Sequence, residues 1–95
     1  MAVLLELSVE AATQELFNKL DDRVGEAMMR AGGPPAGLHA HVVYPVDDGF
    51  VVADVWRAEA EGQAYLSEVL RPLVDDEGLS VREVRARPVW SFARP

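Results

Sequence analysis

The chain has 95 residues, and its 16 acidic and 9 basic side chains give a formal net charge of −7 at pH 7. This acidic balance repels a phosphate backbone, so the composition argues against a nucleic-acid partner. Cysteine is absent, which excludes disulfides, thiolate nucleophiles and Cys-ligated metals and is consistent with a reducing cytoplasm. The N-terminal segment MAVLLELSVE has neither the basic start of a signal peptide nor the length of a membrane span, so we expect a cytoplasmic protein with no membrane contact.

The first third of the chain predicts a strand and then a long helix. Residues 2–8 form a short apolar run typical of a strand, and Ser8 is placed to cap the helix that follows. Between residues 9 and 31 the apolar side chains recur at helical spacing, at Ala12, Leu16, Phe17, Leu20, Val24, Ala27, Met28 and Ala31. The segment Gly32-Gly33-Pro34-Pro35 then ends the helix.

Residues 38–56 predict a β-hairpin. Two strand-like runs flank Asp47-Asp48-Gly49, and Asp-Gly between alternating runs is a strong hairpin signal. The alternation puts a mixed set of side chains on one face, namely His39, His41, Val43, Phe50, Val52, Asp54 and Trp56. The opposite face is apolar throughout, with Leu38, Ala40, Val42, Tyr44, Val51, Ala53 and Val55.

The remainder predicts a second helix and a last strand. After the hairpin, helical spacing joins the apolar residues Tyr65, Leu66, Val69, Leu70 and Leu73. Pro72 should kink or end this helix near its last turn. Pro88, in the strand over residues 79–93, should lie at an edge, at a bulge or where the strand changes partner. The order is therefore βαββαβ, which predicts one ferredoxin-like α+β domain over residues 1–95, with a four-stranded antiparallel sheet and two helices on one face.

The predicted hairpin is apolar on both faces, whereas two helices cover only one face of such a sheet. An open apolar face of this size exceeds what soluble monomers usually expose. A second copy packing sheet to sheet would cover it, and two-fold pairs are the commonest oligomers. We therefore expect a homodimer in which two sheets form a dimeric α+β barrel.

Four short segments carry a family resemblance: Gly37-Leu38-His39-Ala40-His41-Val42, Asp48-Gly49-Phe50, Val52-Ala53-Asp54-Val55-Trp56 and Leu70-Arg71-Pro72-Leu73. With the order of elements, they resemble the small dimeric α+β barrel proteins grouped with the antibiotic-biosynthesis monooxygenases, over nearly the whole chain. The resemblance implies a ligand cleft between each sheet and its own helices, on the face that carries Asp54 and Trp56. Relatives include cofactor-free oxygenases, polyketide cyclases, haem-degrading enzymes, isomerases and members without an assigned activity.

The chain also departs from the family pattern. Its only asparagine, Asn18, falls on a helix, so the strand asparagine of the oxygenase and haem-degrading branches has no match. The second helix carries no histidine that would match a haem ligand. In the last strand, Trp90-Ser91 stands where close look-alikes carry His-Asn. We expect no cofactor.

His41 and Asp54 form the candidate catalytic pair. Facing residues on paired strands have Cβ atoms about 4.5–5.5 Å apart, so the carboxylate can hold the imidazole. An imidazole held in this way can act as a general base toward a phenol or an enolisable carbonyl. The alternative is that the two groups only satisfy each other in the wall of a pocket.

His39, Trp56 and Tyr65 are the candidate substrate contacts. Trp56 matches the tryptophan that many members carry at the end of the third strand, and it either stacks on a planar ligand or serves as a core aromatic. Tyr65 either points into the same cleft or belongs to the apolar stripe of its helix. His39, His41 and Asp54 also make up the residue set of a two-histidine, one-carboxylate metal site, but no fourth ligand accompanies them and we expect no metal.

The leading hypothesis is a cofactor-independent monooxygenase or cyclase-type enzyme that acts on a small aromatic or polyketide-like molecule. The competing hypothesis is a non-catalytic homodimeric module that binds a small ligand or a partner protein. The third hypothesis is a regulatory amino-acid-binding domain. Such a domain usually has a Gly-rich first loop, and the segment Leu7-Ser8-Val9-Glu10 contains no glycine. Arg85 and Arg87 are expected to pair with Glu83 or a partner chain rather than hold a ligand carboxylate.

Overall fold

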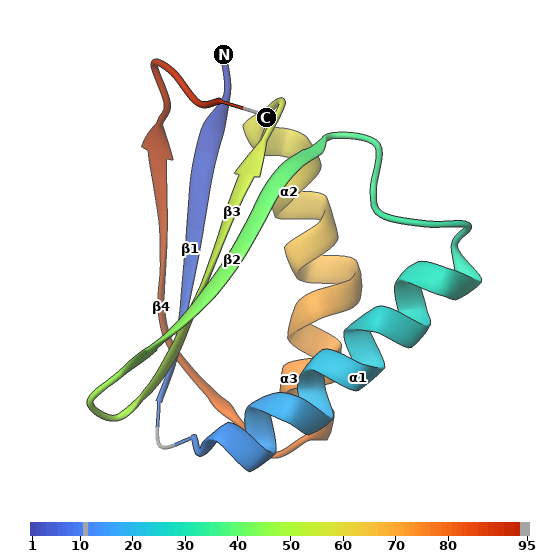
Figure 1. Ribbon diagram of the computed structural model, residues 1–95, viewed down its shortest axis with the longest axis vertical. Helices are drawn as coiled ribbons and strands as arrows, with labels where there is room; N and C mark the ends of the chain where they lie inside the picture. Colours follow the sequence, from blue (N-terminus) through green and yellow to red (C-terminus); the bar gives the residue numbers. More distant parts are fainter. Residues whose placement is uncertain (11, 94–95) are drawn as a thin grey trace.

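The structure, a computed structural model, describes residues 1–10 and 12–93. Its elements follow the expected βαββαβ order, with the second helix divided into three consecutive segments: β1 (Val3–Glu10), α1 (Gln14–Arg30), β2 (Leu38–Val46), β3 (Gly49–Trp56), α2 (Glu59–Tyr65), η1 (Leu66–Leu70), α3 (Arg71–Asp76) and β4 (Ser80–Pro88). The helices lie on one side of the sheet (Figure 1). The ferredoxin-like α+β prediction is therefore confirmed. Within the described ranges, no helix is long and apolar enough to cross a membrane.

The sheet has the strand order β2-β3-β1-β4, and every neighbouring pair is antiparallel. β2 and β4 are therefore the edge strands, and each contains a proline, Pro45 in β2 and Pro88 in β4. Because proline has no N–H to give to a ladder, edge strands tolerate it. The expected edge position of Pro88 is confirmed, although β4 ends there instead of continuing to residue 93.

The first helix begins later than the sequence predicts. β1 continues through Val9, which is 2% exposed and pairs with Phe50 of β3. Thr13, not Ser8, is the N-cap of α1, and its side-chain oxygen accepts the Leu16 N–H at 3.2 Å. Burying a valine stabilises a fold by about 1.5–3 kcal/mol, whereas a cap contributes ~1 kcal/mol. The burial of Val9 therefore accounts for the later boundary.

The core lies between the helices and one face of the sheet. Its larger cluster contains the buried residues Leu7, Val9, Leu20, Phe50, Val52, Leu66, Leu70, Val74 and Leu79. A smaller cluster contains Val3, Leu5 and Trp56, with Leu38 and Tyr65 packed against it. Since Leu5 pairs with Asp54 in the sheet, the face that carries Asp54 and Trp56 looks toward the helices, as the resemblance implied.

A π-helical turn, η1, divides the second helix. The buried side of the helix carries Gly62, Leu66, Leu70 and Val74, at intervals of four residues. Each four-residue step overshoots an α-helical turn by about 40°, so repeated steps would rotate the buried stripe away from the sheet. The wider η1 turn, in which the Arg71 N–H donates to the Leu66 carbonyl, absorbs this drift.

Pro72 follows the π turn and stands near the start of α3, which continues to Asp76. The residues before Pro72 are already helical, so this proline lies inside the helical run, directly after the wider π turn of η1. The helix ends at Asp76, about one turn beyond Pro72, so this proline lies near its last turn as the sequence predicted.

The face of the sheet away from the helices is apolar on its hairpin half. On β2, Val42 is 57% exposed, Tyr44 40% and Val46 42%. The arginines of β4 are paired with acids: Arg87 with Glu6 at 2.6 Å, Arg85 with Glu83 at 3.1 Å, and Arg82 with both Glu10 and Asp48. The expected pairing of Arg85 with Glu83 is therefore confirmed.

After β4 the chain turns back across the end of the sheet (Figure 1). The Val89 N–H donates to the Ala2 carbonyl at 3.0 Å, and Phe92 stacks on His39 of β2 with ring centroids 4.9 Å apart. Because β4 and β2 are opposite edges, this tail spans the width of the sheet. Trp90 is left 94% exposed.

Candidate functional site

His41 of β2 and Asp54 of β3 face each other across paired strands, toward the helices. Their contact joins His41 Nδ1 to Asp54 Oδ1 at 2.6 Å, and a carboxylate accepts hydrogen bonds only, so Nδ1–H is the donor. The Asp54 side chain is 13% exposed and that of His41 is 40% exposed. The pairing expected from the hairpin register is present, with one nitrogen of the imidazole held and Nε2 left free to exchange a proton.

The hydrogen bond with Asp54 is the main cause that raises the pKa of His41 above its usual value. Partial burial of the ring acts in the opposite direction, because it disfavours the imidazolium. The charges of Asp54 and of Asp21 on α1 add to the increase. The pKa of His41 is therefore raised, and the ring keeps its proton to a higher pH than an ordinary histidine does.

Tyr65, the last residue of α2, and Trp56, the last residue of β3, stand beside the pair. Their ring centroids are 5.4 Å apart. Burial raises the pKa of Tyr65, with a smaller contribution from the Asp54 charge, so its hydroxyl stays protonated. Trp56 is only 3% exposed and belongs to the smaller core cluster, but its indole, Tyr65 and Asp54 line the same small hollow.

Asp21 was missed by the sequence reasoning. It lies on α1 and lines the same hollow as His41, Asp54 and Tyr65. A signal was available, because the helical spacing of Phe17, Asp21 and Val24 places this exposed acid at the border of the apolar stripe. The structure thus brings together four polar side chains, contributed by β2, β3, α1 and α2.

His39 does not join this group. A β-bulge lies between Leu38 and Ala40, so Leu38 stands opposite Trp56 while His41 keeps its place opposite Asp54. The extra residue, His39, stacks on Phe92 instead. The strict alternation predicted from sequence is therefore wrong at this end of β2, and Leu38 packs against the Trp56 cluster rather than lying on the outer face.

The bulge also bears on the metal hypothesis. Across the described residues, no group of three His, Asp or Glu side chains is arranged to hold a metal ion. A contact between His39 and a substrate stays a prediction.

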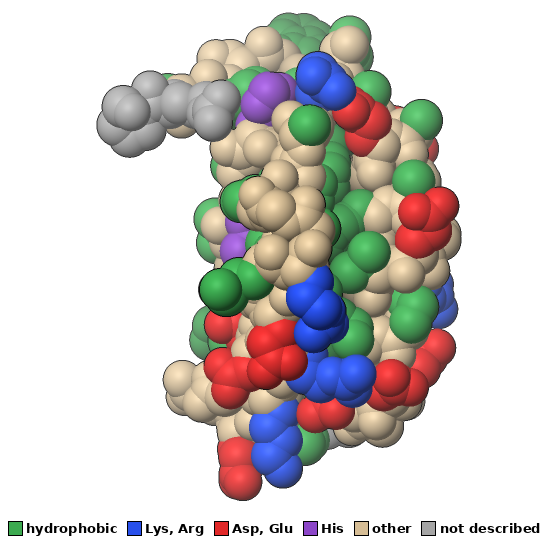
Figure 2. Space-filling model, turned by 90° about the vertical axis from the view of Figure 1, so that its right-hand side faces the viewer, with side chains coloured by type: hydrophobic (Ala, Val, Ile, Leu, Met, Phe, Trp, Pro, Cys, Tyr) green, Lys and Arg blue, Asp and Glu red, His purple; other side chains and the backbone are tan. Residues whose placement is uncertain are grey.

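Both histidines reach the surface on the face shown in Figure 2, near a strip of hydrophobic side chains. The space around His41 is small, however. The hollow shared by His41, Asp54, Asp21 and Tyr65, here called the His41 hollow, has a volume of about 20 Å³. A hollow of about 10–15 Å³ is enough to hold one water molecule, so the His41 hollow has room for about a water molecule and holds no substrate until a side chain moves.

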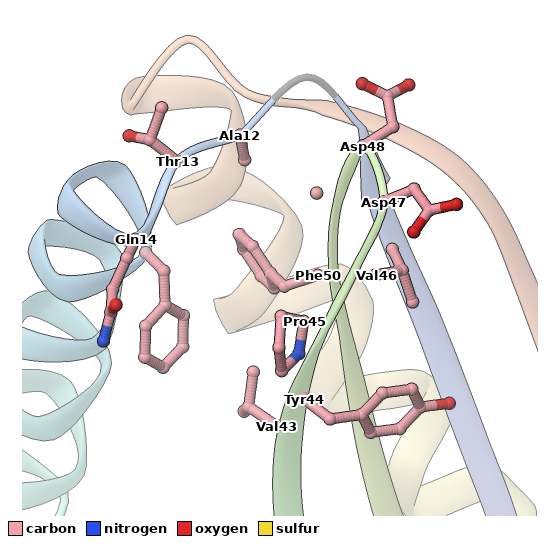
Figure 3. Close-up of a pocket in the computed structure, with 12 residues that line it drawn as sticks. Ala12, Thr13, Gln14, Val43, Tyr44, Pro45, Val46, Asp47, Asp48 and Phe50 are labelled. Carbon is pink, nitrogen blue, oxygen red and sulfur yellow. The ribbon is translucent and has the colours of Figure 1, made fainter.

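A larger hollow of about 430 Å³, here called the hairpin hollow, lies between the start of α1 and the tip of the β2–β3 hairpin (Figure 3). Val43, Pro45 and Phe50 point into it, whereas Tyr44 and Val46 point to the other side of the hairpin. Its volume falls within the 300–1,000 Å³ of typical small-ligand sites. The sequence reasoning did not find this hollow, because it is formed by segments far apart in the chain.

The four-stranded ferredoxin-like arrangement has the same α+β fold as solved structures of antibiotic-biosynthesis monooxygenase-like proteins. A candidate antibiotic biosynthesis monooxygenase from Chloroflexus aurantiacus J-10-fl has a TM-score of 0.64 at 15% identity, with 98% of each chain covered. SnoaB, a cofactor-independent oxygenase from Streptomyces nogalater, has a TM-score of 0.64 at 12% identity, over 96% of this chain and 94% of SnoaB. Rv0793 from Mycobacterium tuberculosis has a TM-score of 0.62 at 11% identity, over 99% of this chain and 100% of its own.

At these identities the likeness shows the fold alone. The resemblance inferred from the hairpin and helix segments is confirmed at that level. No protein-family model and no curated protein match the sequence.

Proposed function

We propose that the protein is a cofactor-independent monooxygenase or cyclase-type enzyme that acts on a small aromatic or polyketide-like substrate between the sheet and its helices. His41 is the general base, Asp54 orients it, and Trp56 and Tyr65 contact the substrate. The observation that carries the proposal is the 2.6 Å contact between His41 Nδ1 and Asp54 Oδ1, in a hollow that α1 and α2 also line. The same fold in SnoaB, a cofactor-independent oxygenase, supports the reaction class.

The proposed chemistry begins with a proton transfer to His41. Because Asp54 accepts the Nδ1–H, the neutral ring presents Nε2 as the proton acceptor. A phenol or carbon acid at Nε2 becomes an electron-rich anion, which either reduces O₂ or attacks a carbonyl of the same molecule. The hydrogen bond to Asp54 raises the pKa of His41, which makes the neutral imidazole a stronger base for this step.

The neighbouring polar groups support both partners in this step. Asp54 and Asp21 stabilise the imidazolium that forms when His41 takes the proton. Tyr65 keeps its proton at neutral pH, so its hydroxyl can donate a hydrogen bond to the oxyanion of the substrate. In this proposal His41 accepts the proton and Tyr65 donates a hydrogen bond, and both side chains line the same hollow.

The proposed enzyme is a homodimer. Val42, Tyr44 and Val46 form an exposed apolar strip on the outer face of the hairpin, and Trp90 of the tail is almost fully exposed. Burying apolar surface contributes about 25 cal/mol per Å², and a second copy of the same strip is a self-complementary cover. The family that the sequence resembles consists of dimeric α+β barrel proteins, which supports the same assembly here.

Anthrone is a suitable probe for the test, because it is a planar carbon acid whose anion reacts with O₂. The expected reaction is anthrone plus O₂ to anthraquinone plus water, in which one oxygen atom enters the new carbonyl and the other leaves as water. Oxygen uptake and anthraquinone absorbance report turnover above the spontaneous rate. His41→Asn should reduce the catalysed rate by about 100-fold or more, the usual contribution of a general base.

Asp22→Asn is the matched control, because this exposed α1 residue lies next to Asp21 without being among the charges that shift the pKa of His41. It should leave the rate unchanged, and circular dichroism should show all variants folded. Equal turnover of anthrone by wild type and His41→Asn would rule out the proposed base. If wild type is inactive on anthrone, a set of β-polyketone esters tests the cyclase alternative with the same variants.

A non-catalytic small-ligand-binding module is the second candidate function. The observation in its favour is that the space large enough for a ligand is not the one that contains His41. The hairpin hollow has a volume of about 430 Å³, whereas the His41 hollow has a volume of about 20 Å³. A binding module would retain its ligand affinity in His41→Asn and would convert none of the probes.

A further inference from the structure

The two hollows share part of their lining. Phe17 of α1 and Val43 of β2 line both the hairpin hollow and the His41 hollow. The Phe17 ring packs edge-on against Phe50, with centroids 5.2 Å apart and an interplanar angle of 68°. Phe17 and Val43 therefore separate the hairpin hollow, which is large enough for a ligand, from the His41 hollow, which contains the candidate base.

The interior of the hairpin hollow favours an uncharged ligand. Asp47 and Asp48 are the only charged residues among its described lining residues, and their side chains point away from the hollow (Figure 3). Asp48 is already paired with Arg82 at 2.7 Å. A charged ligand would therefore lose its hydration without gaining a partner, and an anion would also meet a chain of net charge −7.

The aromatic and apolar side chains of the walls favour a flat ring system as the ligand. Phe17 and Phe50 present aromatic surface, and Val43 and Pro45 complete the apolar walls. The Thr13 side-chain oxygen accepts the Leu16 N–H but keeps its O–H as a donor, so Thr13 and Gln14 are polar groups of the rim that can bind a ligand hydroxyl or carbonyl. A ligand ring that packs against an aromatic side chain gains about 0.5–1.5 kcal/mol of interaction free energy per pair, beyond the contribution of buried area.

We propose that the hairpin hollow binds an uncharged, flat aromatic ligand and that the Phe17 side chain separates this ligand from His41. A ligand enters between the start of α1 and the hairpin tip, and displacement of the Phe17 ring joins the two hollows. Binding in the hairpin hollow is independent of the enzymatic role of His41, whereas the passage toward His41 rests on the proposed function. The two parts are therefore tested separately.

The first experiment measures binding with two matched dyes. N-Phenyl-1-naphthylamine is uncharged, and 1-anilinonaphthalene-8-sulfonate has the same rings with an added sulfonate. The uncharged dye should bind the wild-type protein saturably with one dye per chain, and the sulfonate should bind at least about 10-fold more weakly because its charge finds no partner.

Two tryptophan variants locate the dye. Pro45→Trp places a large ring in the mouth of the hairpin hollow at an exposed edge-strand position and should weaken binding at least 10-fold. Ala64→Trp adds the same ring at an exposed α2 position that does not line the hollow, and it should bind as wild type does. Unchanged binding in Pro45→Trp, or equal affinity for both dyes, would overturn the assignment of ligand and site.

The second experiment follows the partition by NMR. In wild type, the uncharged dye should shift the methyl signals of Val43 and leave the imidazole signals of His41 unshifted. In Phe17→Ala, which removes the shared aromatic wall, the same dye should shift the signals of both residues. Phe17→Leu retains more of the core packing and serves as the second variant if Phe17→Ala does not fold.

The partition idea fails if the wild-type imidazole already shifts with the dye, or if it remains unshifted in a folded Phe17 variant. Neither result depends on turnover. An inactive protein that binds the dye and shows the expected Phe17 effect would contradict only the enzymatic proposal, whereas an active protein without that effect would contradict only the partition.

Discussion

A Cβ atom added to Gly62 would stand 2.8 Å from Cδ1 of the Trp56 indole. It would also stand 2.6 Å from a methyl carbon of Leu5, so α2 lies directly on the sheet at this point. Glycine is required here for close approach rather than for an unusual backbone angle. This contact fixes the distance between α2 and the sheet just before Tyr65, and so it positions the aromatic wall of the candidate site.

Gly62→Ala should destabilise the protein by about 1–3 kcal/mol, because the added methyl overpacks the contact with Trp56 and Leu5. Gly25→Ala is the control, since this α1 glycine has no heavy atom within 4 Å of an added Cβ. Gly25→Ala should stabilise the protein by about 0.5–1 kcal/mol, as alanine is the better helix former. Urea unfolding measures both, and a neutral Gly62→Ala would show that the approach of α2 is not tight.

Asp54→Asn should lower the pKa of His41, because it removes the carboxylate that is the main cause of the raised value. Asp21→Asn should lower it by a smaller amount, and Asp22→Asn should leave it unchanged. NMR titration of the imidazole signals gives all four values. A larger effect from Asp21 than from Asp54 would mean that the α1 carboxylate is the principal partner.

The pair of His41 and Asp54 should make stability depend on pH. The pKa of His41 is raised in the folded state, so the contribution is complete below the unfolded pKa of about 6.5 and is lost as pH rises through the folded pKa. Because the His41 side chain is 40% exposed, screening by solvent limits the contribution to about 0.5 kcal/mol.

Comparing wild type with His41→Asn by urea unfolding at about pH 5.5 and about pH 8.5 isolates this contribution. The stability difference between the two proteins should be larger at the lower pH. The opposite order would mean that the folded state favours the neutral imidazole.

Val42→Glu should dissociate the proposed dimer, because it places a charge at the most exposed valine of the apolar strip on β2. Light scattering at micromolar concentration should give the mass of two chains for wild type and of one for the variant. Ala64→Glu, at an exposed position on α2, should remain dimeric. A monomeric wild type would contradict both the dimer and the reasoning from exposed apolar surface.

The sequence alone determined the order of elements, the hairpin and the pairing of His41 with Asp54. These features follow from local rules, because alternation and an Asp-Gly turn set the register of adjacent strands. The same local rules failed at His39, which is the extra residue of a β-bulge. The bulge keeps His41 opposite Asp54 but removes the His39 side chain from the face that carries His41. Strict alternation contains no information about such an insertion.

The tertiary structure decided what surrounds the pair. Asp21 from α1 and Tyr65 from α2 line the same hollow as His41 only because the helices pack on that face of the sheet. Val9 remains in β1 because its burial outweighs an earlier helix start. The hairpin hollow and the Phe17 partition likewise exist only between segments distant in sequence. The physical reason is that periodicity specifies which side of an element is buried, whereas the volume left between two elements depends on how closely their side chains pack.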